Sequence, residues 1–491
     1  MDYLDPLKNR RDKRLLFIGY FLITIMIALT TLVLFYVTEG FGVNGNGSVI
    51  QNSLLFFSSQ PNPANIYINN KLFSSQTNTS FLLPAGTYNV KIARSGYTPW
   101  QRSIIVNGGT VEHFDYPFLF PSKLITTNLM SIDSLPTLDT QSLDRRWLLV
   151  SNPNQFNQFF LYDLNNPTNN PVIDTIPTSV ISTAKTSQSW KVIQWSSDNQ
   201  HLILEHIYDG QTEFILVDIQ NPALSVNLTK TFTNLSFDKI VMINNQYNYY
   251  YLYNSTSQQL SSVSLASPQV INMTLYNILA FKAYSNNIIL FATNDTSKSG
   301  KVLIEEQVGS KVYIIKSLNS ASRYLLNLTS YNSIPYVVIG DSNSDKIYIY
   351  QDPISQLNNN PTLSPGPIQV LLIQNPSYIS FSDSSQFVVA ENMNHFAVYN
   401  FQSGYAYNYS IKSQLDQPQT NAVWMDGDRL TYVSNGNLIV FDYDGANLRV
   451  LSKSNPSLLS FFNKNYSDIF SILDNNNSSS SYFTETSLVA Q

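Results

Sequence analysis

A run of 23 residues without a charged side chain, residues 15–37, constrains this chain more than any other feature of its sequence. At about 1.5 Å per residue, a helix of this length spans the roughly 30 Å hydrocarbon core of a bilayer. A segment in lipid must satisfy its own backbone polar groups, so the run predicts a transmembrane helix that begins at Leu15 and ends at Val37. The lipid bilayer is therefore the first partner that the sequence predicts.

The charges on either side of this run predict its orientation. Five basic residues precede it, whereas Glu39 is the only charged residue between Val37 and Lys71. By the positive-inside rule, residues 1–14 form a basic cytoplasmic tail and residues 38–491 are extracytoplasmic. We therefore expect a single-pass protein of the plasma membrane. The five basic residues are Lys8, Arg10, Arg11, Lys13 and Arg14.

Two other interpretations of the run fit it less well. A cleaved secretory signal has an apolar region of about 7–15 residues that ends at a small-residue cleavage site, and the segment after residue 37 offers no such site. A buried helix of a soluble protein is disfavoured by the length of the run and by its basic flank. The sequence therefore favours an uncleaved signal-anchor.

The composition of the remaining chain favours strands. The chain has 491 residues, which is long enough for two or three domains after the anchor. Only 12% of its residues are charged, while 13% are aromatic, and 31 residues are Tyr. Tyr, Ile, Val and Phe interleaved with Asn, Ser, Gly and Pro are typical of many short strands and tight turns. We therefore expect an all-β ectodomain on one N-terminal transmembrane helix.

Charge and cysteine content exclude several classes of function. The net charge is −5 and no basic block lies outside the N-terminal tail, so the chain has no electrostatic footprint for nucleic acid. The absence of cysteine excludes disulfides, thiolate zinc sites and cysteine nucleophiles. The sequence leaves the oligomeric state open, and it leaves glycosylation of its many Asn-x-Ser/Thr triplets open as well.

The first part of the ectodomain is predicted to be a tether followed by a small β domain. Residues 38–52 contain four glycines within eight positions and almost no charge, which is typical of a flexible spacer. Residues 53–121 alternate short apolar runs with turn clusters. The alternation is clearest at Tyr88, Val90 and Ile92, as expected for strands with one buried face. The segment is long enough for a small β-sandwich.

Two stretches of this β domain resemble a known family. Residues 83–90, LPAGTYNV, followed by Gly96 and Tyr97, resemble the PEGA domain, whose name-giving segment joins a Pro-x-Gly turn, an alternating strand and a Gly-Tyr pair. Residues 63–70, PANIYINN, are similar to the first half of that family. The Gly-x-Thr-Pro that usually lies between the halves is replaced by residues 75–80. PEGA domains are non-catalytic modules of surface-anchored prokaryotic proteins, so the resemblance implies a spacer or adhesive unit.

Residues 122–491 carry a longer repeat that predicts a β-propeller. Runs of apolar residues separated by polar turns recur, and the runs that close successive copies are spaced by 55, 47, 51, 35, 49, 42 and 45 residues. Periods in the forties with three or four strands per unit are typical of propeller blades. The count admits eight blades or seven, because two copies are faint and one interval is short. The closing runs begin near Phe159, Phe214, Ser261, Val312, Ile347, Phe396, Leu438 and Phe483.

One turn of the repeat carries a second resemblance. Residues 195–199, WSSDN, are similar to the Trp-Ser-Pro-Asp-Gly turn of TolB-like and WD40-like propellers, and residues 381–385, FSDSS, are a looser copy. The Pro and Gly of that turn are missing from both copies, and the Gly-His and Trp-Asp pairs of true WD40 units are not seen. The resemblance therefore implies a generic propeller over residues of roughly 124 to 491.

We find no catalytic, cofactor-binding or metal-ligating residue in the sequence. No Gly-x-Ser-x-Gly elbow occurs. Of the four histidines, His201 and His206 bracket a strand and point to opposite faces, so we expect turn or surface histidines rather than a shared metal site. Residues 341–352 imitate a calcium loop, but Lys346 stands where that loop needs Gly, which predicts an ordinary polar turn.

The resulting hypothesis is a non-catalytic cell-surface protein. The anchor would hold the PEGA-like domain and the propeller outside the cell, where they bind an envelope protein or glycan or act as a scaffold. The alternative is an extracytoplasmic hydrolase or lyase whose site lies in the propeller channel. Clustered carboxylates, or a group of Tyr, Arg and Glu side chains in that channel, would favour the alternative.

Overall fold

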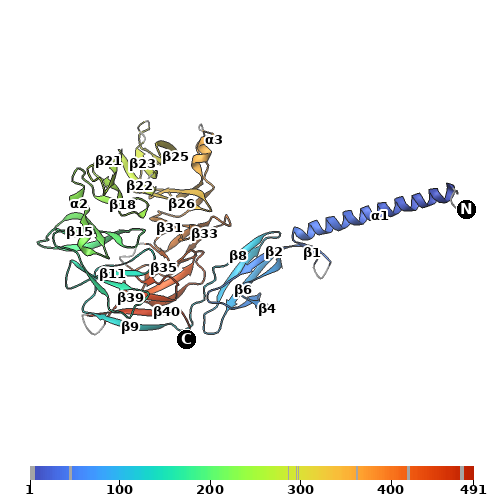
Figure 1. The fold of residues 1–491 in the computed structure, drawn as a ribbon, viewed down its shortest axis with the longest axis horizontal. Helices are drawn as coiled ribbons and strands as arrows, with labels where there is room; N and C mark the ends of the chain where they lie inside the picture. The colour runs from blue at the N-terminus through green and yellow to red at the C-terminus, as the bar shows by residue number, and fades with distance from the viewer. Residues whose placement is uncertain are drawn as a thin grey trace. The chain divides into compact units, whose positions relative to one another are not determined.

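The computed structural model describes residues 6–43, 47–285, 287–294, 296, 298–360, 363–416, 421–475 and 480–490. The chain forms two compact units, residues 1–123 with 490–491 and residues 124–489. Figure 1 shows the first unit in blue and the second in colours from teal to red. The boundary falls close to the predicted one at residues 121 and 122.

Helix α1 (Pro6–Thr38) contains the predicted membrane span. Residues 13–38 of this helix form one apolar stretch near the N-terminus, long enough to cross a membrane, and none of it is buried in the protein. Its threonine hydroxyls within the apolar run need no outside partner, because Thr24, Thr30 and Thr31 donate hydrogen bonds of 2.8–2.9 Å to carbonyls four residues earlier in the helix. This internal pairing suits a helix surrounded by lipid.

The first unit contains a sandwich of two four-stranded sheets. One sheet has the order β1-β2-β5, and β8 pairs with β2 in parallel; the other has the order β4-β3-β6-β7. The core between the sheets includes Leu55 and Phe57 from one sheet, and Ile66, Ile92 and Trp100 from the other. The strands are β1 (Phe41–Val43), β2 (Val49–Phe57), β3 (Asn65–Ile68), β4 (Lys71–Gln76), β5 (Thr79–Pro84), β6 (Gly86–Ala93), β7 (Trp100–Val106) and β8 (Val111–Phe114).

The structure corrects the expectation of an open tether at residues 38–52. Strand β1 and the beginning of β2 lie in this segment and pair with each other, from Phe41 opposite Gln51 to Val43 opposite Val49. Two of the glycines that predicted flexibility, Gly40 and Gly47, instead have a φ of 81°, a conformation typical of turns. Gly-rich composition cannot distinguish a spacer from a tight hairpin, because both need residues without a Cβ. The prediction for residues 44–46 lies outside the described residues.

Within its described residues, the second unit consists of eight four-stranded antiparallel sheets, which we call blades 1 to 8. The repeat in the sequence allowed seven or eight blades, and the structure has eight in its described residues. Blade 1 contains β10 (Asp139–Gln141), β11 (Trp147–Ser151), β12 (Gln158–Asp163) and β13 (Val172–Thr175). Blade 2 contains β14 (Gln188–Trp195), β15 (His201–Tyr208), β16 (Gln211–Asp218) and β17 (Val226–Asn227). Blade 3 contains β18 (Lys239–Met242), β19 (Tyr249–Asn254), β20 (Gln259–Ser264) and β21 (Ile271–Leu275). Blade 4 contains β22 (Ile278–Ser285), β23 (Ile288–Asn294), β24 (Lys301–Val308) and β25 (Lys311–Asn319).

The remaining blades complete the ring. Blade 5 contains β26 (Tyr324–Tyr331), β27 (Ile334–Asp341), β28 (Lys346–Gln351) and β29 (Gln369–Leu372). Blade 6 contains β30 (Tyr378–Phe381), β31 (Phe387–Asn392), β32 (His395–Asn400) and β33 (Ala406–Ser410). Blade 7 contains β34 (Val423–Trp424), β35 (Arg429–Ser434), β36 (Asn437–Asp442) and β37 (Arg449–Lys453). Blade 8 contains β38 (Phe461–Phe462), β39 (Asp468–Asp474), β40 (Ser481–Ser487) and β9 (Ile125–Ile132). Short helices lie between strands: η1 (Pro222–Leu224), α2 (Leu228–Thr231), η2 (Ile243–Asn245) and α3 (Pro353–Asn359).

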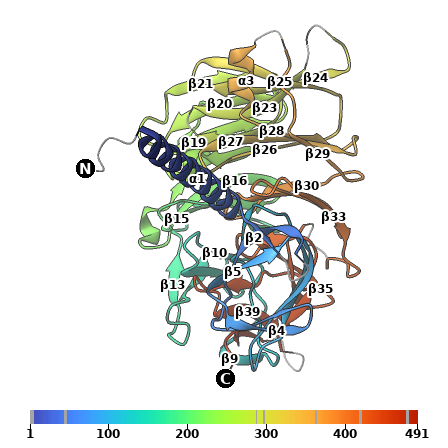
Figure 2. The same ribbon diagram turned by 90° about the vertical axis from the view of Figure 1, so that its right-hand side faces the viewer.

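Strand β9 closes the ring of blades, because it comes first in the unit and yet is the fourth strand of the last blade. It pairs antiparallel with β40, from Ile125 opposite Ser487 to Ile132 opposite Ser481. Strands β9 and β39 of this sheet lie near each other in Figure 2. The colours of the blades pass in order from teal at β11 to red at β39 in Figure 1. The unit is therefore a closed β-propeller.

Apolar clusters join successive blades. One cluster contains Leu149 of blade 1 and Leu204 of blade 2, and others join blades 2 to 3, 3 to 4, 4 to 5 and 5 to 6. A further cluster joins blade 8 to blade 1 and includes Phe483 and Tyr162, whose rings lie 4.4 Å apart. Each blade thus buries its faces against its neighbours rather than against a core of its own.

The short interval in the predicted repeat has a structural cause. Val312 lies on β25, the fourth strand of blade 4, whereas the other seven markers lie on third strands. The third strand of blade 4 is β24, and placing the marker at Val302 gives spacings of 41 and 45 residues. The irregular spacing came from choosing the wrong strand of a faint copy, so it did not indicate a missing blade.

Replacing Phe483 by Ala should test the closure of the ring. The side chain is fully buried between blades 8 and 1, so its removal should lower the free energy of unfolding of the propeller by about 3–5 kcal/mol. Chemical denaturation of the full chain in detergent measures this loss. The control V172A changes an exposed residue of β13 and should stay within about 0.5 kcal/mol of the parent. A similar small effect of F483A would contradict the closure described here.

Glu391 should make the stability of the propeller depend on pH. This carboxyl on β31 is fully buried; one oxygen accepts the N–H of Ala422 at 2.8 Å, and the other has no partner among the described residues. Burial raises its pKa to about 8, and burial also raises the pKa of Asp139, Asp174 and Glu306 to about 7. Because folding favours the protonated forms, the stability that they contribute is present below about pH 4 and is lost as the pH rises through 7 to 8.

We therefore expect the free energy of unfolding to fall between pH 5 and pH 8. The variant E391Q keeps the shape of the protonated carboxyl without its proton equilibrium, so its stability should fall less steeply over this range. Denaturation curves at several pH values measure both slopes. Equal slopes for the two proteins would contradict a protonated Glu391.

Candidate binding cavity in the propeller channel

A cavity of about 1240 Å³ lies along one side of the propeller channel. Its wall is built mainly from the first strands of four successive blades, β14, β18, β22 and β26, together with the segments next to them. The first strand of a blade lies nearest the propeller axis, so these strands are the ones that line a central channel. The wall combines aromatic, amide, hydroxyl and basic side chains on rigid elements.

Strand β22 turns two large side chains into this cavity. Lys282 and Tyr284 are both exposed, and both line the cavity. The pairing of β22 with β23 shifts register on each side of residues 280–283, and such irregularities re-aim side chains. The exposed surface of Lys282 faces the cavity, yet burial by the surrounding protein lowers its pKa below the usual value.

Hydrogen bonds hold two of the aromatic rings of the wall in place. The hydroxyl of Tyr253 donates to the carbonyl of Ile278 at 2.7 Å. The hydroxyl of Tyr324 accepts the N–H of Ala321 at 2.9 Å. Tyr284, in contrast, exposes 42% of its surface. Rigid aromatic surface with one accessible ring is typical of ligand sites.

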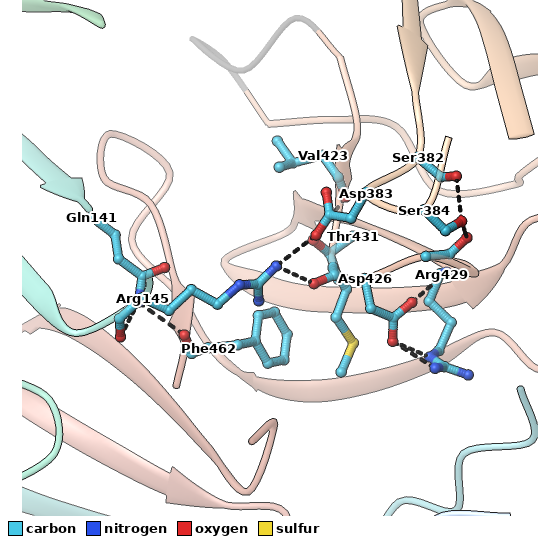
Figure 3. A network of polar contacts seen from close by, with 12 residues as sticks. Gln141, Arg145, Ser382, Asp383, Ser384, Val423, Asp426, Arg429, Thr431 and Phe462 are labelled. Atoms are coloured by element: carbon cyan, nitrogen blue, oxygen red, sulfur yellow. Dashed lines mark hydrogen bonds and ion pairs between the residues drawn. The ribbon is translucent and has the colours of Figure 1, made fainter. Parts of the chain in front are cut away.

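The opposite side of the channel is occupied by a polar cluster, which we call the Arg145 cluster: Arg145, Asp383, Asp426, Arg429 and Tyr466. Figure 3 shows the first four of these residues. Arg145 lies in the turn between the first two strands of blade 1. Its Nη2 donates to Asp383 Oδ2 of blade 6 at 2.9 Å and to the carbonyl of Met425 of blade 7 at 2.7 Å. Its guanidinium lies 4.7 Å from the ring centre of Tyr466 of blade 8. One side chain therefore links four blades across the channel.

The buried pair of Asp426 and Arg429 supports this cluster. Arg429 donates from Nε at 2.9 Å and from Nη2 at 2.5 Å to Asp426 Oδ2. Asp426 Oδ1 also accepts the N–H groups of Asp428 and Arg429. Burial alone would lower the pKa of Arg429, but Asp426, Asp442 and Asp428 raise it above its usual value. These charges are paired within the protein, so the Arg145 cluster is a structural link rather than an open site.

The turns singled out in the sequence are the turns at one end of this channel. Residues 195–199 and 381–385 both join the first and second strands of their blades, as the resemblance to propeller repeats implied. Asp198 accepts the N–H groups of Gln200 and His201, and Asn199 has a φ of 59°, so Asn takes the place of the missing Gly.

Sequence reasoning missed two further turns of this type. Residues 142–146, SLDRR, and residues 424–428, WMDGD, occupy the same place in blades 1 and 7. The available signal was a Ser or Trp followed by an Asp, shortly before an apolar strand. The missed turn in blade 1 carries Arg145. The φ of Arg145 is 63°, which is unusual for a residue other than Gly, Asn or Asp.

The structure keeps His201 and His206 apart and corrects one expectation. His201 Nδ1 lies 2.7 Å from Asp198 Oδ2, whereas His206 Nδ1 lies 2.9 Å from Glu213 Oε1. His206 is fully buried within β15, so the prediction of a turn or surface histidine is wrong for it. The surrounding rings explain its burial, since Phe156 and Trp190 lie within 5.1 Å of its ring centre.

The segment that imitates a calcium loop forms the turn between β27 and β28, strand β28 itself and the cap of α3. Asp341 Oδ1 accepts the N–H of Asn343 at 2.9 Å, and Asp345 Oδ1 accepts the N–H of Asn375 at 3.2 Å. Asp352 caps α3 by accepting the N–H of Ser355. Among the residues that the structure describes, no group of three or more His, Asp or Glu side chains could hold a metal ion.

Comparison with known proteins identifies the class of the first β domain. Residues 53–119 match the PEGA domain family, which confirms the resemblance of that segment. The chain therefore combines an apolar N-terminal helix, a PEGA domain and an eight-bladed β-propeller. Among curated proteins, none matches the sequence.

Solved structures with a similar fold share little sequence with this chain. Hsv2 of Kluyvelomyces marxianus is 9% identical, with a TM-score of 0.39 over 71% of this chain and 96% of that chain. The β-propeller domain of Cps50 (Swd1) from Myceliophteria thermophila is 14% identical, with a TM-score of 0.37 over 66% and 99%. An oligogalacturonate lyase from Vibrio parahaemolyticus is 11% identical, with a TM-score of 0.37 over 75% and 94%. At these values the likeness carries no argument about function.

Two substitutions of Arg145 should separate its contacts from its backbone strain. Ala and Gly both remove the links to Asp383 and Met425, but only Gly adopts a φ of 63° without a steric cost. We therefore expect R145G to be more stable than R145A by about 1 kcal/mol in chemical denaturation. Equal stabilities, or a more stable R145A, would contradict the strained turn.

Proposed function

We propose that this protein is a non-catalytic binding protein of the cell surface. Helix α1 anchors it in the plasma membrane with the basic tail in the cytoplasm, and the PEGA domain and propeller lie outside. The ligand is a glycan of the cell envelope, and it binds in the channel cavity. The observation that carries this proposal is the cavity itself, a volume of about 1240 Å³ on rigid inner strands.

The chemistry of the wall supports a glycan as the ligand. A sugar ring presents apolar C–H faces and a rim of hydroxyls. The ring of Tyr284 offers an accessible apolar face, while Gln194, Asn244 and Ser322 place amide and hydroxyl groups on the same wall. Aromatic side chains with a few polar groups that fix orientation are the usual composition of small-molecule sites.

The composition of the wall also supports binding rather than hydrolysis. Glycoside hydrolysis usually requires two carboxyl groups that flank the scissile bond. No Asp or Glu is among the described residues that line the cavity. The proposed activity is therefore recognition, with the PEGA domain as a spacer between membrane and propeller.

Replacing Tyr284 by Ala tests this proposal. Full-length protein in detergent is incubated with a glycan fraction of the cell envelope, and retention is measured for the parent and the variant. Because an accessible aromatic side chain in a binding site contributes about 1–2 kcal/mol, Y284A should weaken binding about tenfold. The control Y405A changes an exposed Tyr outside the cavity, between β32 and β33, and should bind like the parent.

Two results would contradict the proposal. Equal retention of Y284A and the parent would mean that the cavity is not the binding site. New reducing or unsaturated sugar ends after incubation with the parent protein would mean that the protein is an enzyme.

A further inference from the structure

The described wall of the channel cavity carries three basic side chains and no acidic one: Lys239, Lys282 and Arg323. The chain as a whole has the opposite balance, with 33 acidic and 28 basic residues. A cavity lined by one sign of charge focuses its field and attracts ligands of the other sign. The excess of basic over acidic side chains is therefore specific to the cavity wall, and it indicates an anionic ligand.

None of these three cations has a carboxylate within 4.0 Å among the described residues. In the described part of the propeller, the ion pairs formed by Lys and Arg use other residues, namely Arg145, Arg146, Lys191, Lys230 and Arg429. Two carboxylates lie near the cations in the chain or in the sheet, but each accepts a hydrogen bond from a backbone N–H group elsewhere. Asp238 accepts the N–H of Ser255 at 2.8 Å, and Asp341 accepts the N–H of Asn343 at 2.9 Å.

The cations are distributed along the cavity. Lys239 is the first residue of β18, and its amino group lies 5.5 Å from the ring centre of Tyr253 on the neighbouring strand. Arg323 directly precedes β26, so it lies at the end of the channel where first strands begin. Lys282 lies further along β22, beyond the middle of the strand. An elongated ligand that entered from this end would meet Lys239 and Arg323 first and Lys282 deeper in the cavity.

An anion in the cavity would stabilise the charged form of Lys282. Its side chain faces the cavity, and the protein around it disfavours its charged form, because burial lowers its pKa. A negatively charged group beside the amino nitrogen would favour the charged form of Lys282 again by direct electrostatic attraction. The same group would supply the partner that the described residues do not provide.

We propose that the glycan bound in the channel is acidic, with carboxylates on successive sugar units that pair with Arg323 near the entrance and Lys282 inside. This inference rests on the proposed function and names the ligand class of the same cavity. The planar guanidinium of Arg323 matches a carboxylate bidentately, while the amino group of Lys282 acts as a point charge. The ring of Tyr284, two residues from Lys282, then packs on a sugar face.

A comparison of two forms of one probe tests this inference. The envelope glycan fraction is used either untreated or after chemical reduction of its carboxylates to alcohols, and full-length protein in detergent is the receptor. We expect the reduced fraction to bind at least tenfold more weakly than the untreated one. Binding of the untreated fraction should also weaken as the salt concentration rises, because exposed charges are screened.

Three variants locate the effect in the cavity. K282Q and R323Q should each weaken binding of the untreated fraction about tenfold, since each removes the charged partner of one carboxylate, and each should weaken binding of the reduced fraction less. The matched control K311Q removes an exposed lysine from the outer strand of the same blade and should change neither.

Any other outcome contradicts a specific part of the two proposals. If the reduced fraction binds as tightly as the untreated one, or if K282Q and R323Q bind like the parent, the acidic ligand is wrong and the proposed glycan receptor stands. If neither fraction is retained, both proposals fail. If single-stranded oligothymidylate binds more tightly than the untreated fraction, the cavity selects a phosphate-bearing polymer and the inference of an acidic glycan fails.

Discussion

The pairing of β9 with β40 is the interaction on which the propeller depends. It runs from Ile125 opposite Ser487 to Ile132 opposite Ser481 and joins the first strand of the unit to its last blade. Each blade is a four-stranded sheet whose faces are covered by neighbouring blades, so an open ring would leave two apolar faces in water. Closure removes both, and it also directs the first strand of every blade toward one axis. The channel is a consequence of this closure.

The two sides of the channel differ in how their charged side chains are paired. Blades 1, 6, 7 and 8 are linked by the Arg145 cluster, in which the charges are paired within the protein. Blades 2 to 5 enclose the cavity, where Lys239, Lys282 and Arg323 have no acidic partner among the described residues. Paired charges stabilise a link between blades, whereas unpaired charges of one sign attract a ligand. This difference explains why the cavity, rather than the more densely hydrogen-bonded cluster, is the candidate binding site.

Much of the fold could be predicted from local patterns. The apolar run at residues 15–37, the PEGA turn at residues 83–90 and the spacing of the closing runs each depend on neighbours in sequence, so they indicated the helix, the β domain and the propeller. Two local predictions failed for physical reasons. Residues 41–43 and 49–51 pair as strands rather than forming a spacer. His206 is buried because the rings of Phe156, from a loop of blade 1, and of Trp190, from β14, lie close to it.

The cavity could not be predicted in the same way. Lys239, Lys282 and Arg323 are separated by more than forty residues each and come together only because β18, β22 and β26 begin around one axis. No spacing motif joins them, and in the sequence each is an isolated basic residue. Finding them required an alignment of the first strands of the blades. Blade 4, which carries Lys282, was the faint copy in which the wrong strand was chosen.

The most direct test of the central claim uses the absence of cysteine in the chain. The cysteine introduced by S320C would lie at an exposed position on the cavity wall, and the one introduced by K311C would lie on an outer strand. On intact cells, a membrane-impermeant thiol reagent should modify both from outside. The account predicts that added envelope glycan slows the reaction at position 320 and leaves position 311 unchanged. Failure of both cysteines to react on intact cells, or equal rates at position 320 with and without glycan, would contradict an outward-facing channel that binds an envelope ligand.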